Sequence, residues 1–235
     1  PRSAEAADAL ERLDQGFDTF LKMLDEKVGA SNYLVVVTAD HGVAELPEYR
    51  DEQGSKCPVP GRLSVEKLVT SIYWDLFWKF TLPHWPANAF KISGSQLFFN
   101  RAFLSKHDLD LDEGIEVLDQ IMTDQDIVKA AWSAEEISAG RSEEARLYRN
   151  SYVAGLSGDL LLQTHEDCVI TRESGTTHGS PYDYDRNIPL IFMGHGIIAG
   201  ADESDAHSVD IATTLADWLD LDRPANLQGQ VLKLD

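Results

Sequence analysis

The sequence predicts an α/β fold, a three-layer sandwich in which a mixed, mainly parallel sheet lies between helices. Two observations predict it. Segments with apolar residues at every third or fourth position alternate with short apolar runs, and polar segments containing glycine or proline separate them. With 235 residues, 43% of them hydrophobic, the chain is long enough for one sizeable core and a second small lobe.

The first predicted elements are a long amphipathic helix and a buried strand. Apolar residues recur with helical spacing from Ala6 to Val28, and Gly29 ends the helix. The apolar run at residues 33–38 then predicts a strand. Residues 40–63 are rich in glycine and proline, so we expect a loop that could form a mobile rim at this end of the strand.

The central region predicts an αβ unit of its own. A helix over residues 65–80, stopped near Pro83, precedes alternating strands and helices. These are expected at residues 96–99, 111–122, 127–132, 142–152 and 159–163. We expect residues 64–165 to be a cap inserted between two core segments, residues 1–63 and 166–235, where it would shape substrate access.

The tetrapeptide Ala39-Asp40-His41-Gly42 directly follows the first predicted strand, at the edge where open α/β sheets bind their ligands. Neighbouring strand side chains point to opposite faces, so Asp40 and His41 converge on one ion only if the backbone turns at Gly42. A carboxylate and an imidazole suit Zn²⁺, with Mn²⁺ or Fe as alternatives, although zinc needs three or four ligands. An ordinary turn at the start of a loop is the other interpretation.

A second polar segment, residues 173–189, carries His178 and leads into a predicted strand at residues 190–193. Its glycines and prolines are typical of a loop that presents side chains rather than burying them. His178 is a further candidate metal ligand because it lies near a second strand end. A solvated loop histidine is the alternative.

Three charged residues follow His178 closely: Asp183, Asp185 and Arg186. They could orient His178 and its loop, or form a local ion pair that braces the loop. The remaining histidines have no partners at ligand spacing, and we expect them to be surface or hydrogen-bonded histidines: His84, His107, His165, His195 and His207.

The order of these blocks resembles the C-terminal half of the alkaline phosphatase superfamily. A strand with Asp-His-Gly, a long intervening region and the sequence Gly-Thr-Thr-His-Gly-Ser-Pro-Tyr-Asp-Tyr-Asp at residues 175–185 carry the resemblance. It is strongest to the single-chain bacterial alkaline phosphatases and the type I phosphodiesterase/nucleotide pyrophosphatase branch. Residues 208–221, followed by Pro224 and Gln228-Gly229, resemble the helix and closing segment of that superfamily.

The resemblance implies two metal ions, usually zinc, at the carboxyl edge of the sheet. Asp40 and His41 would bind the ion that activates the nucleophile, and His178 would bind the ion that receives the attacking water. Two cations can stabilise both the entering and the leaving oxygen of a phosphoryl displacement. No other residue of this chain matches a metal ligand of the family.

The resemblance also implies that part of the site lies upstream of Pro1. The family's nucleophile, a Thr or Ser at a helix start, and the other metal ligands match nothing in this sequence, and residues 3–21 resemble the helix that follows them. We therefore expect a fragment of a longer polypeptide that is inactive by itself. Thr38 and Thr177 are alternative nucleophiles, but neither matches the family position.

Composition limits the partners. Twenty Lys and Arg against 40 Asp and Glu give a formal charge of −20, which repels a nucleic-acid duplex, and no basic stripe is present. A phosphate ester would be repelled too, so a phosphatase needs positive charge from bound metal. We expect Trp74, Trp78 and Trp85 to pack in the core or cap rather than to stack on bases. No apolar run approaches the roughly 18 residues of a membrane span.

The sequence leaves the compartment open. Cys57 and Cys168 are the only cysteines, and they could form one disulfide in a secreted protein or remain two thiols. No signal peptide is visible, but in a fragment this observation says nothing about secretion. The resemblance implies a periplasmic or secreted protein.

These features together predict that the whole protein hydrolyses a small-molecule phosphate monoester through a covalent phospho-enzyme, with Asp40, His41 and His178 among the ligands of two divalent ions. One alternative is a phosphodiesterase, nucleotide pyrophosphatase, phosphonate hydrolase or sulfatase on the same scaffold. A phosphomutase is a second alternative. A non-enzymatic relative that uses the fold for binding is the third.

Overall fold

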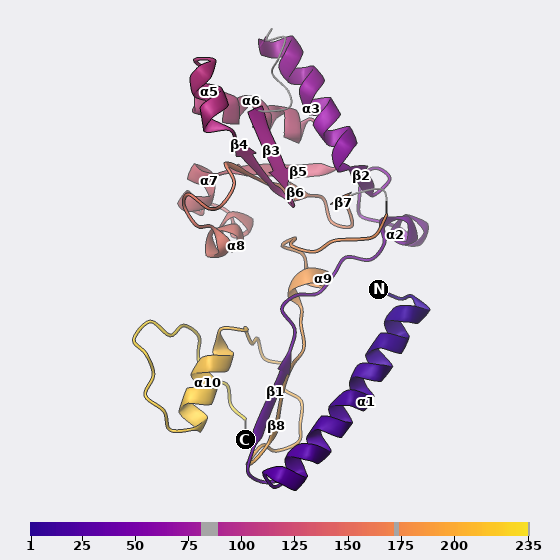
Figure 1. Ribbon diagram of the computed structural model, residues 1–235, viewed down its shortest axis with the longest axis vertical. Coiled ribbons are helices and arrows are strands. Elements are labelled where there is room, and N and C mark those ends of the chain that lie inside the picture. Colours follow the sequence, from indigo (N-terminus) through magenta and orange to yellow (C-terminus); the bar gives the residue numbers. More distant parts are fainter. Residues whose placement is uncertain (81–88, 172–173, 235) are drawn as a thin grey trace. The chain divides into compact units, whose positions relative to one another are not determined.

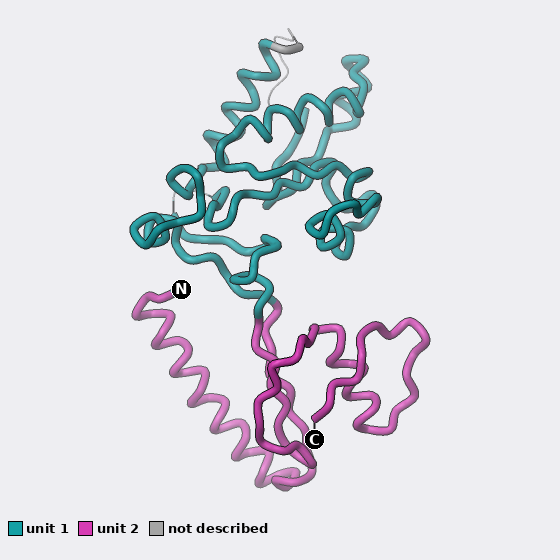
Figure 2. The backbone as a smooth tube through the Cα atoms, turned by 180° about the vertical axis from the view of Figure 1, so that it is seen from behind, with its two compact units in different colours: residues 1, 41–187 teal, residues 2–40, 188–235 magenta. Residues whose placement is uncertain are grey.

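The computed structural model describes residues 1–80, 89–171 and 174–234, which form two compact units (Figures 1 and 2). The larger unit comprises residues 41–187 with Pro1, and the smaller comprises residues 2–40 and 188–235. That residues 64–165 are a cap inserted into the core, with boundaries at 63/64 and 165/166, stays a prediction. The predictions for Pro83, His84, Trp85 and Glu173 lie outside the described residues.

The smaller unit contains the predicted first helix and strand. Helix α1 (Ala4–Lys27) begins at Ser3, whose hydroxyl accepts the backbone N–H of Ala6 at 3.1 Å, the usual capping arrangement. Strand β1 (Leu34–Thr38) follows and pairs antiparallel with β8 (Leu190–Gly194). Helix α10 (Asp210–Trp218) lies within the C-terminal segment where the resemblance predicts a helix.

The larger unit is built on a four-stranded sheet with the order β3-β4-β6-β5. Its helices α3 and α6 supply most of the apolar cover: α6 contacts β5 and β6, and α3 contacts α6. Leu68, Ile72 and Leu76 follow one another at four-residue spacing on α3 and are fully buried. The bounds of these elements are α3 (Val65–Phe80), β3 (Phe90–Ser93), β4 (Gln96–Phe99), α6 (Leu111–Thr123), β5 (Val128–Ser133) and β6 (Leu160–Thr164).

Shorter elements complete the larger unit. Strands β2 (Arg62–Ser64) and β7 (Val169–Thr171) form a small parallel pair. Among the described residues, the short helices of this unit are α2 (Pro47–Gln53), α5 (Arg101–Lys106), α7 (Ala134–Ala139), α8 (Glu143–Ser151) and α9 (Asp183–Arg186).

The strand pairing is mixed, as predicted, but parallel pairs do not predominate among the described strands. Only β2 and β7 run parallel there, and the other four pairs are antiparallel. Antiparallel strands can be joined by a two-residue turn, whereas parallel strands need a long crossover. Gly94 and Ser95 form such a turn between β3 and β4, with Gly94 at a φ of +60°.

The expected loop over residues 40–63 contains a helix and a strand. Pro47 occupies the first turn of α2, where its fixed φ suits a helix start, and Gly54 ends the helix with a φ of +92°. Proline and glycine therefore mark the two ends of a short helix here. The sequence pattern did not distinguish this arrangement from an open loop.

The expectation that Trp74 and Trp78 pack in the core or cap is wrong. Their exposed fractions are 60% and 73%, and both contact Phe77 edge-on. The reason is the rotation of α3, since the face with Leu68, Ile72 and Leu76 is the one that meets the core.

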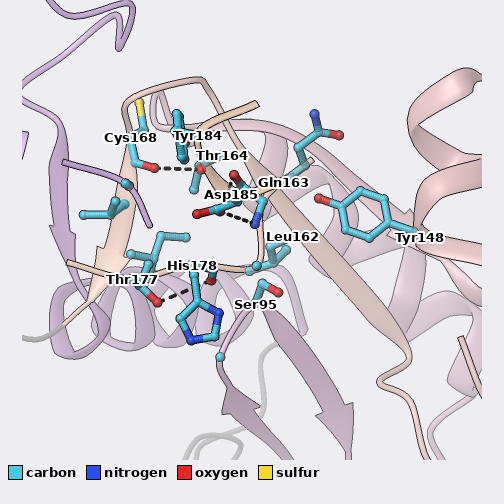
Figure 3. A pocket seen from close by; sticks show the side chains of 16 residues that line it. Ser95, Tyr148, Leu162, Gln163, Thr164, Cys168, Thr177, His178, Tyr184 and Asp185 are labelled. Atoms are coloured by element: carbon cyan, nitrogen blue, oxygen red, sulfur yellow. Dashed lines mark hydrogen bonds between the residues drawn. The ribbon is translucent and has the colours of Figure 1, made fainter. Parts of the chain in front are cut away.

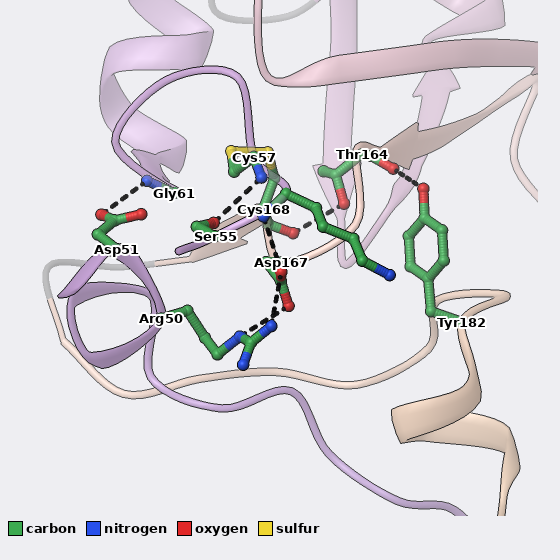
Figure 4. Close-up of a disulfide and its surroundings, with 10 residues drawn as sticks. Arg50, Asp51, Ser55, Cys57, Gly61, Thr164, Asp167, Cys168 and Tyr182 are labelled. Carbon is green, nitrogen blue, oxygen red and sulfur yellow. Dashed lines mark hydrogen bonds and ion pairs between the residues drawn. A yellow bond between two sulfur atoms is a disulfide. The ribbon is translucent and has the colours of Figure 1, made fainter. Parts of the chain in front are cut away.

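A disulfide links Cys57, after α2, to Cys168, before β7 (Figure 4). Beside it, Arg50 donates from Nε and Nη2 to the two carboxylate oxygens of Asp167, each at 3.1 Å, and the backbone N–H of Lys56 donates to one of them at 2.9 Å. Burial favours the neutral acid, but these hydrogen bonds outweigh it and lower the pKa of Asp167. The segment after α2 is thus fixed to the turn between β6 and β7.

Candidate metal-binding active site

Two histidine rings from distant parts of the sequence lie face to face in the larger unit. His41 comes after β1, and His178 lies in the segment that leads into α9. Their ring centroids are 3.6 Å apart, and the ring planes differ by 10°. The structure therefore brings these two predicted residues together, while their role as metal ligands stays a prediction.

Asp40, the third predicted ligand, adjoins His41 in the chain and is the last residue of the smaller unit's first segment. In the described part of the chain, no group of three or more His, Cys, Asp and Glu side chains is arranged to hold one ion. These residues would therefore supply only a share of a complete zinc coordination shell, which needs three or four ligands.

The orientation of the His41 ring suits a metal ligand. Its Nδ1 lies 2.6 Å from the carbonyl oxygen of Gly42. Because a carbonyl can only accept a hydrogen bond, this contact requires a proton on Nδ1, and in the neutral ring Nε2 is then the acceptor nitrogen. Metal-binding histidines commonly have this arrangement, with one ring nitrogen held by a backbone carbonyl and the other directed at the ion.

Hydrogen bonds hold the two histidine segments side by side. The backbone N–H of Ala44 donates to the carbonyl of Thr177 at 3.2 Å, and the hydroxyl of Thr176 donates to the carbonyl of Ala44 at 2.8 Å. Arg62 extends this network, because its Nη2 donates to the carbonyl of Gly175 at 2.7 Å. The segment before His178 is therefore anchored at three successive residues.

Asp185 connects the two histidine segments from α9. Its backbone carbonyl accepts the N–H of Gly42 at 2.7 Å, and its Oδ2 accepts the N–H and the hydroxyl of Ser180 at 2.8 and 2.6 Å. A Cβ on Gly42 would clash with the carbonyl oxygen of Tyr184, so glycine is required at this close approach. Instead of the ion pair considered from sequence, Asp185 makes hydrogen bonds with Ser180.

A cavity of about 90 Å³ lies next to these loops, with His178, Asp185, Tyr148 and Tyr184 in its wall (Figure 3). Burial raises the pKa of Tyr184 to about 12 and raises the pKa of Tyr148 further. Both phenols therefore stay neutral at physiological pH and can donate hydrogen bonds. They add no negative charge to the wall.

Other candidate residues take no part in this arrangement. His107 packs on the ring of Phe103, with centroids 4.3 Å apart, and Nδ1 of His207 lies 3.9 Å from Asp210 in the smaller unit. The hydroxyl of Thr177 lies 3.4 Å from the carbonyl of its neighbour His178. This contact gives Thr177 no base that would activate it as a nucleophile.

Comparison with known proteins decides the family. The family model described as type I phosphodiesterase / nucleotide pyrophosphatase matches residues 1–187. The chain belongs to this family. Its membership in the alkaline phosphatase superfamily, predicted from Asp40-His41-Gly42 and the sequence at residues 175–185, is confirmed.

Relatives of this phosphodiesterase-family chain include named alkaline phosphatases. It is 33% identical over 236 residues to alkaline phosphatase PafA of Elizabethkingia meningoseptica, covering 98% of this chain and 41% of PafA. It is 27% identical to alkaline phosphatase PhoV of Synechococcus elongatus, covering 99% and 41%. The crystal structure of wild-type PafA matches with a TM-score of 0.83 at 30% identity, covering 99% of this chain and 44% of that one. The chain thus spans about two fifths of the length of these relatives.

Sequence reasoning missed the residues that hold the loops of this family member. Ser180 lies in the block at residues 175–185, which predicts no role for it, and Arg62 belongs to no motif; their partners lie 5 and 113 positions away in the chain. Gly42 was recognised only as a turn. Only for Asp185 does the sequence predict such a role, because it follows His178 closely enough to orient it.

Proposed function

We propose that the whole protein to which this chain belongs hydrolyses small-molecule phosphate monoesters with two divalent metal ions and a covalent phospho-enzyme intermediate. The observation that carries the proposal is the face-to-face pair of His41 and His178 in a member of this family. The alkaline phosphatase names of PafA and PhoV support the monoester substrate.

The donors on the two loops fit zinc or a similar divalent ion. Asp40 offers a carboxylate, His41 an imidazole with Nε2 as acceptor, and His178 a second imidazole. The lone pair of an imidazole lies in the ring plane, so two nearly parallel rings do not direct their lone pairs at one ion between them. Each ring would serve its own ion, and ions in two-metal sites lie about 3.5–4 Å apart. When bound, such ions supply the positive charge that activates the nucleophile and neutralises the phosphoryl oxygens.

The residues of this chain would bind the two metal ions and orient the histidine ligands. Asp40 and His41 would hold one ion and His178 the other. Gly42, Ser180 and Asp185 would fix the positions of the two histidine segments through hydrogen bonds. The nucleophile and the remaining ligands would come from the part of the relatives' length that this chain does not span. The 235-residue chain by itself is therefore expected to be inactive.

The ligand assignment is tested in the full-length protein by Asp40→Asn and His178→Asn. Both variants should bind less zinc and lose p-nitrophenyl phosphate turnover by about tenfold or more, because each removes a donor from an ion. Elemental analysis after dialysis and steady-state kinetics measure the two effects. His107→Asn, an exposed histidine outside the site, is the control and should match the wild type. Unchanged zinc content in both site variants would refute the assignment.

The missing nucleophile has a separate test. The 235-residue chain, supplied with Zn²⁺, should show no turnover of p-nitrophenyl phosphate above that of free zinc. Appreciable turnover would mean that the nucleophile lies within this chain, with Thr38 and Thr177 as the candidates to substitute first.

A phosphodiesterase is the second candidate function, because the family model that matches is named for diester and pyrophosphate hydrolysis. Monoester, diester and sulfate esters of p-nitrophenol, assayed side by side, separate the candidates. The proposal expects the highest kcat/KM for the monoester. A higher kcat/KM for the diester or the sulfate ester would replace the monoesterase proposal with a phosphodiesterase or a sulfatase.

We also propose a periplasmic or secreted location. The pairing of Cys57 with Cys168 supports it, because disulfides persist in oxidising compartments. No described helix combines the length and apolar character that a bilayer crossing requires. Cell fractionation followed by thiol alkylation and mass spectrometry should find the protein outside the cytoplasm with both cysteines protected from alkylation.

A further inference from the structure

Asp185 is a buried acid in the wall of the cavity beside His178 (Figure 3). Only 5% of its surface is exposed, although it lies in a four-residue helix within a polar segment. Acidic residues are almost never buried to this extent unless they have a specific partner. The contacts of Asp185 therefore indicate why a carboxylate is kept there.

The carboxylate holds the segment that carries His178. Oδ2 accepts both the N–H and the hydroxyl of Ser180, two positions after His178. Two hydrogen bonds to one acceptor oxygen fix the position of this backbone more firmly than a single bond would. Ser180 thus has little freedom to move relative to α9.

The backbone of Asp185 holds the other histidine. Its carbonyl accepts the N–H of Gly42, the residue directly after His41, at 2.7 Å. The carbonyl of Gly42 also accepts a hydrogen bond from Nδ1 of His41, so the peptide units on both sides of Gly42 are fixed. A single residue, Asp185, therefore makes contacts to both of the segments that bring the two rings together.

A second buried acid, Asp210, shows how an acid that only caps the backbone is used in this protein. Its Oδ1 accepts a hydrogen bond from the backbone N–H of Gln230, and its Oδ2 accepts one from the backbone N–H of His207, each at 2.8 Å. Both oxygens therefore bind backbone groups. Asp185 uses Oδ2 alone, and its buried Oδ1 makes no hydrogen bond with the described residues. Buried polar atoms almost always have a hydrogen-bond partner, so the unused Oδ1 distinguishes Asp185 from Asp210.

We propose that Asp185 is the positioning residue of the metal site, which sets the His178 segment against the turn after His41 and so sets the affinity for the ion at His178. This inference rests on the proposed function. Asp185 would touch neither ion nor substrate. Outer residues that orient metal-binding histidines commonly change metal affinity by about tenfold or more when they are removed.

The test measures zinc affinity in the full-length protein by competition with a chromophoric chelator, together with thermal unfolding. Asp185→Ala should weaken zinc binding by about tenfold or more, and Ser180→Ala should weaken it less, because only one of the two bonds to Oδ2 is lost. Asp185→Asn keeps an acceptor oxygen for Ser180 and should bind zinc within about threefold of the wild type. Asp210→Ala is the matched control, expected to lower the melting temperature without changing zinc affinity.

Equal zinc affinities of the wild type and Asp185→Ala would overturn the inference, as would an equal loss in Asp210→Ala. If Asp185→Ala does not fold, Ser180→Ala decides, and a wild-type zinc affinity in that variant overturns it. The variant His178→Asn distinguishes a failure of the proposed function from a failure of the positioning role alone. If the wild type binds no zinc or His178→Asn binds it normally, the proposed function itself fails. If His178→Asn loses zinc while the Asp185 and Ser180 variants do not, only the positioning role of Asp185 fails.

Discussion

At the scale of single residues, Arg62 joins three segments of the larger unit. Its guanidinium donates to both carboxylate oxygens of Glu48 in α2, to the hydroxyl of Thr171 in β7 and to the carbonyl of Gly175. Its side chain is only 14% exposed. A planar guanidinium can serve these directions at once, whereas a lysine ammonium is a compact charge that cannot reproduce the geometry.

We therefore predict that Arg62→Lys lowers the free energy of unfolding by about 1–3 kcal/mol, because part-buried acceptors lose their donors. It should also weaken zinc binding, since Gly175 precedes His178 by three positions. Chemical denaturation and chelator competition measure the two effects. Arg223→Lys, in a half-exposed ion pair with Asp217, is the control and should change neither. Equal behaviour of the two variants would contradict the role given to Arg62.

Glu48 gives this contact a pH dependence. Hydrogen bonds from Arg62 lower the pKa of Glu48 from 4.5 to about 2. A lowered pKa means that the stabilisation is complete above the unfolded value and is lost as pH falls towards the folded one. Because the Glu48 side chain is 62% exposed, the stabilisation is at most about 1 kcal/mol. The difference in unfolding free energy between the wild type and Glu48→Gln should therefore be present at pH 7 and shrink between pH 4.5 and 2. A difference that stays constant down to pH 2 would rule out this linkage.

The candidate site was predictable only in part. His41 and His178 could be found because they lie near predicted strand ends in motifs that resemble those of the family, and the structure brings their rings together. The residues that fix those rings, Ser180 and Arg62, act through hydrogen bonds whose existence depends on the folded path of the chain. A polar residue in a polar segment carries no sequence signal for such a contact.

At the scale of elements, helices with clear apolar spacing and strands with apolar runs were predictable, whereas the short helices α2, α5, α7 and α9 were not. Helices α1, α3 and α6 follow from their apolar spacing, and β1 and β8 from apolar runs. Helix α7 did carry a local signal that was overlooked, since Ser133 and Glu136 form a capping box and Gly140 closes the helix at a φ of +55°. Helix α9 has four residues and no side-chain cap, so it lacks the local sequence signals that predict a helix.

The disulfide supports a further prediction at this scale. It joins segments 111 positions apart, and a cross-link over so long a loop restricts the unfolded chain strongly. The double variant Cys57→Ser/Cys168→Ser should lose about 2–4 kcal/mol of unfolding free energy. Urea denaturation of the variant and of the reduced wild type should agree. A loss below about 1 kcal/mol in both would contradict the view that this cross-link stabilises the protein by restricting the unfolded chain.

At the scale of the whole molecule, the two units differ in what holds them together. Every buried apolar side chain among the described residues belongs to residues 41–187. In the smaller unit, α1 has no buried residue, and the buried residues of α10 are Asp210, Thr213 and Thr214. Burial of apolar surface is the main source of folding free energy, so the two units should differ in stability.

Hydrogen exchange of the 235-residue chain should therefore show two levels of protection. Amides of α3, α6, β5 and β6 should exchange slowly, because opening them exposes the apolar core, whereas amides of α1 should exchange by local opening at a much lower free energy. In the full-length protein the protection of α1 should rise, if residues outside this chain cover the side chains that are exposed here: Leu10, Leu13, Phe20 and Met23. Mass-spectrometric exchange of both proteins measures this difference. Equal protection of α1 and α6 in the 235-residue chain would show that the smaller unit is stabilised by something other than buried apolar surface.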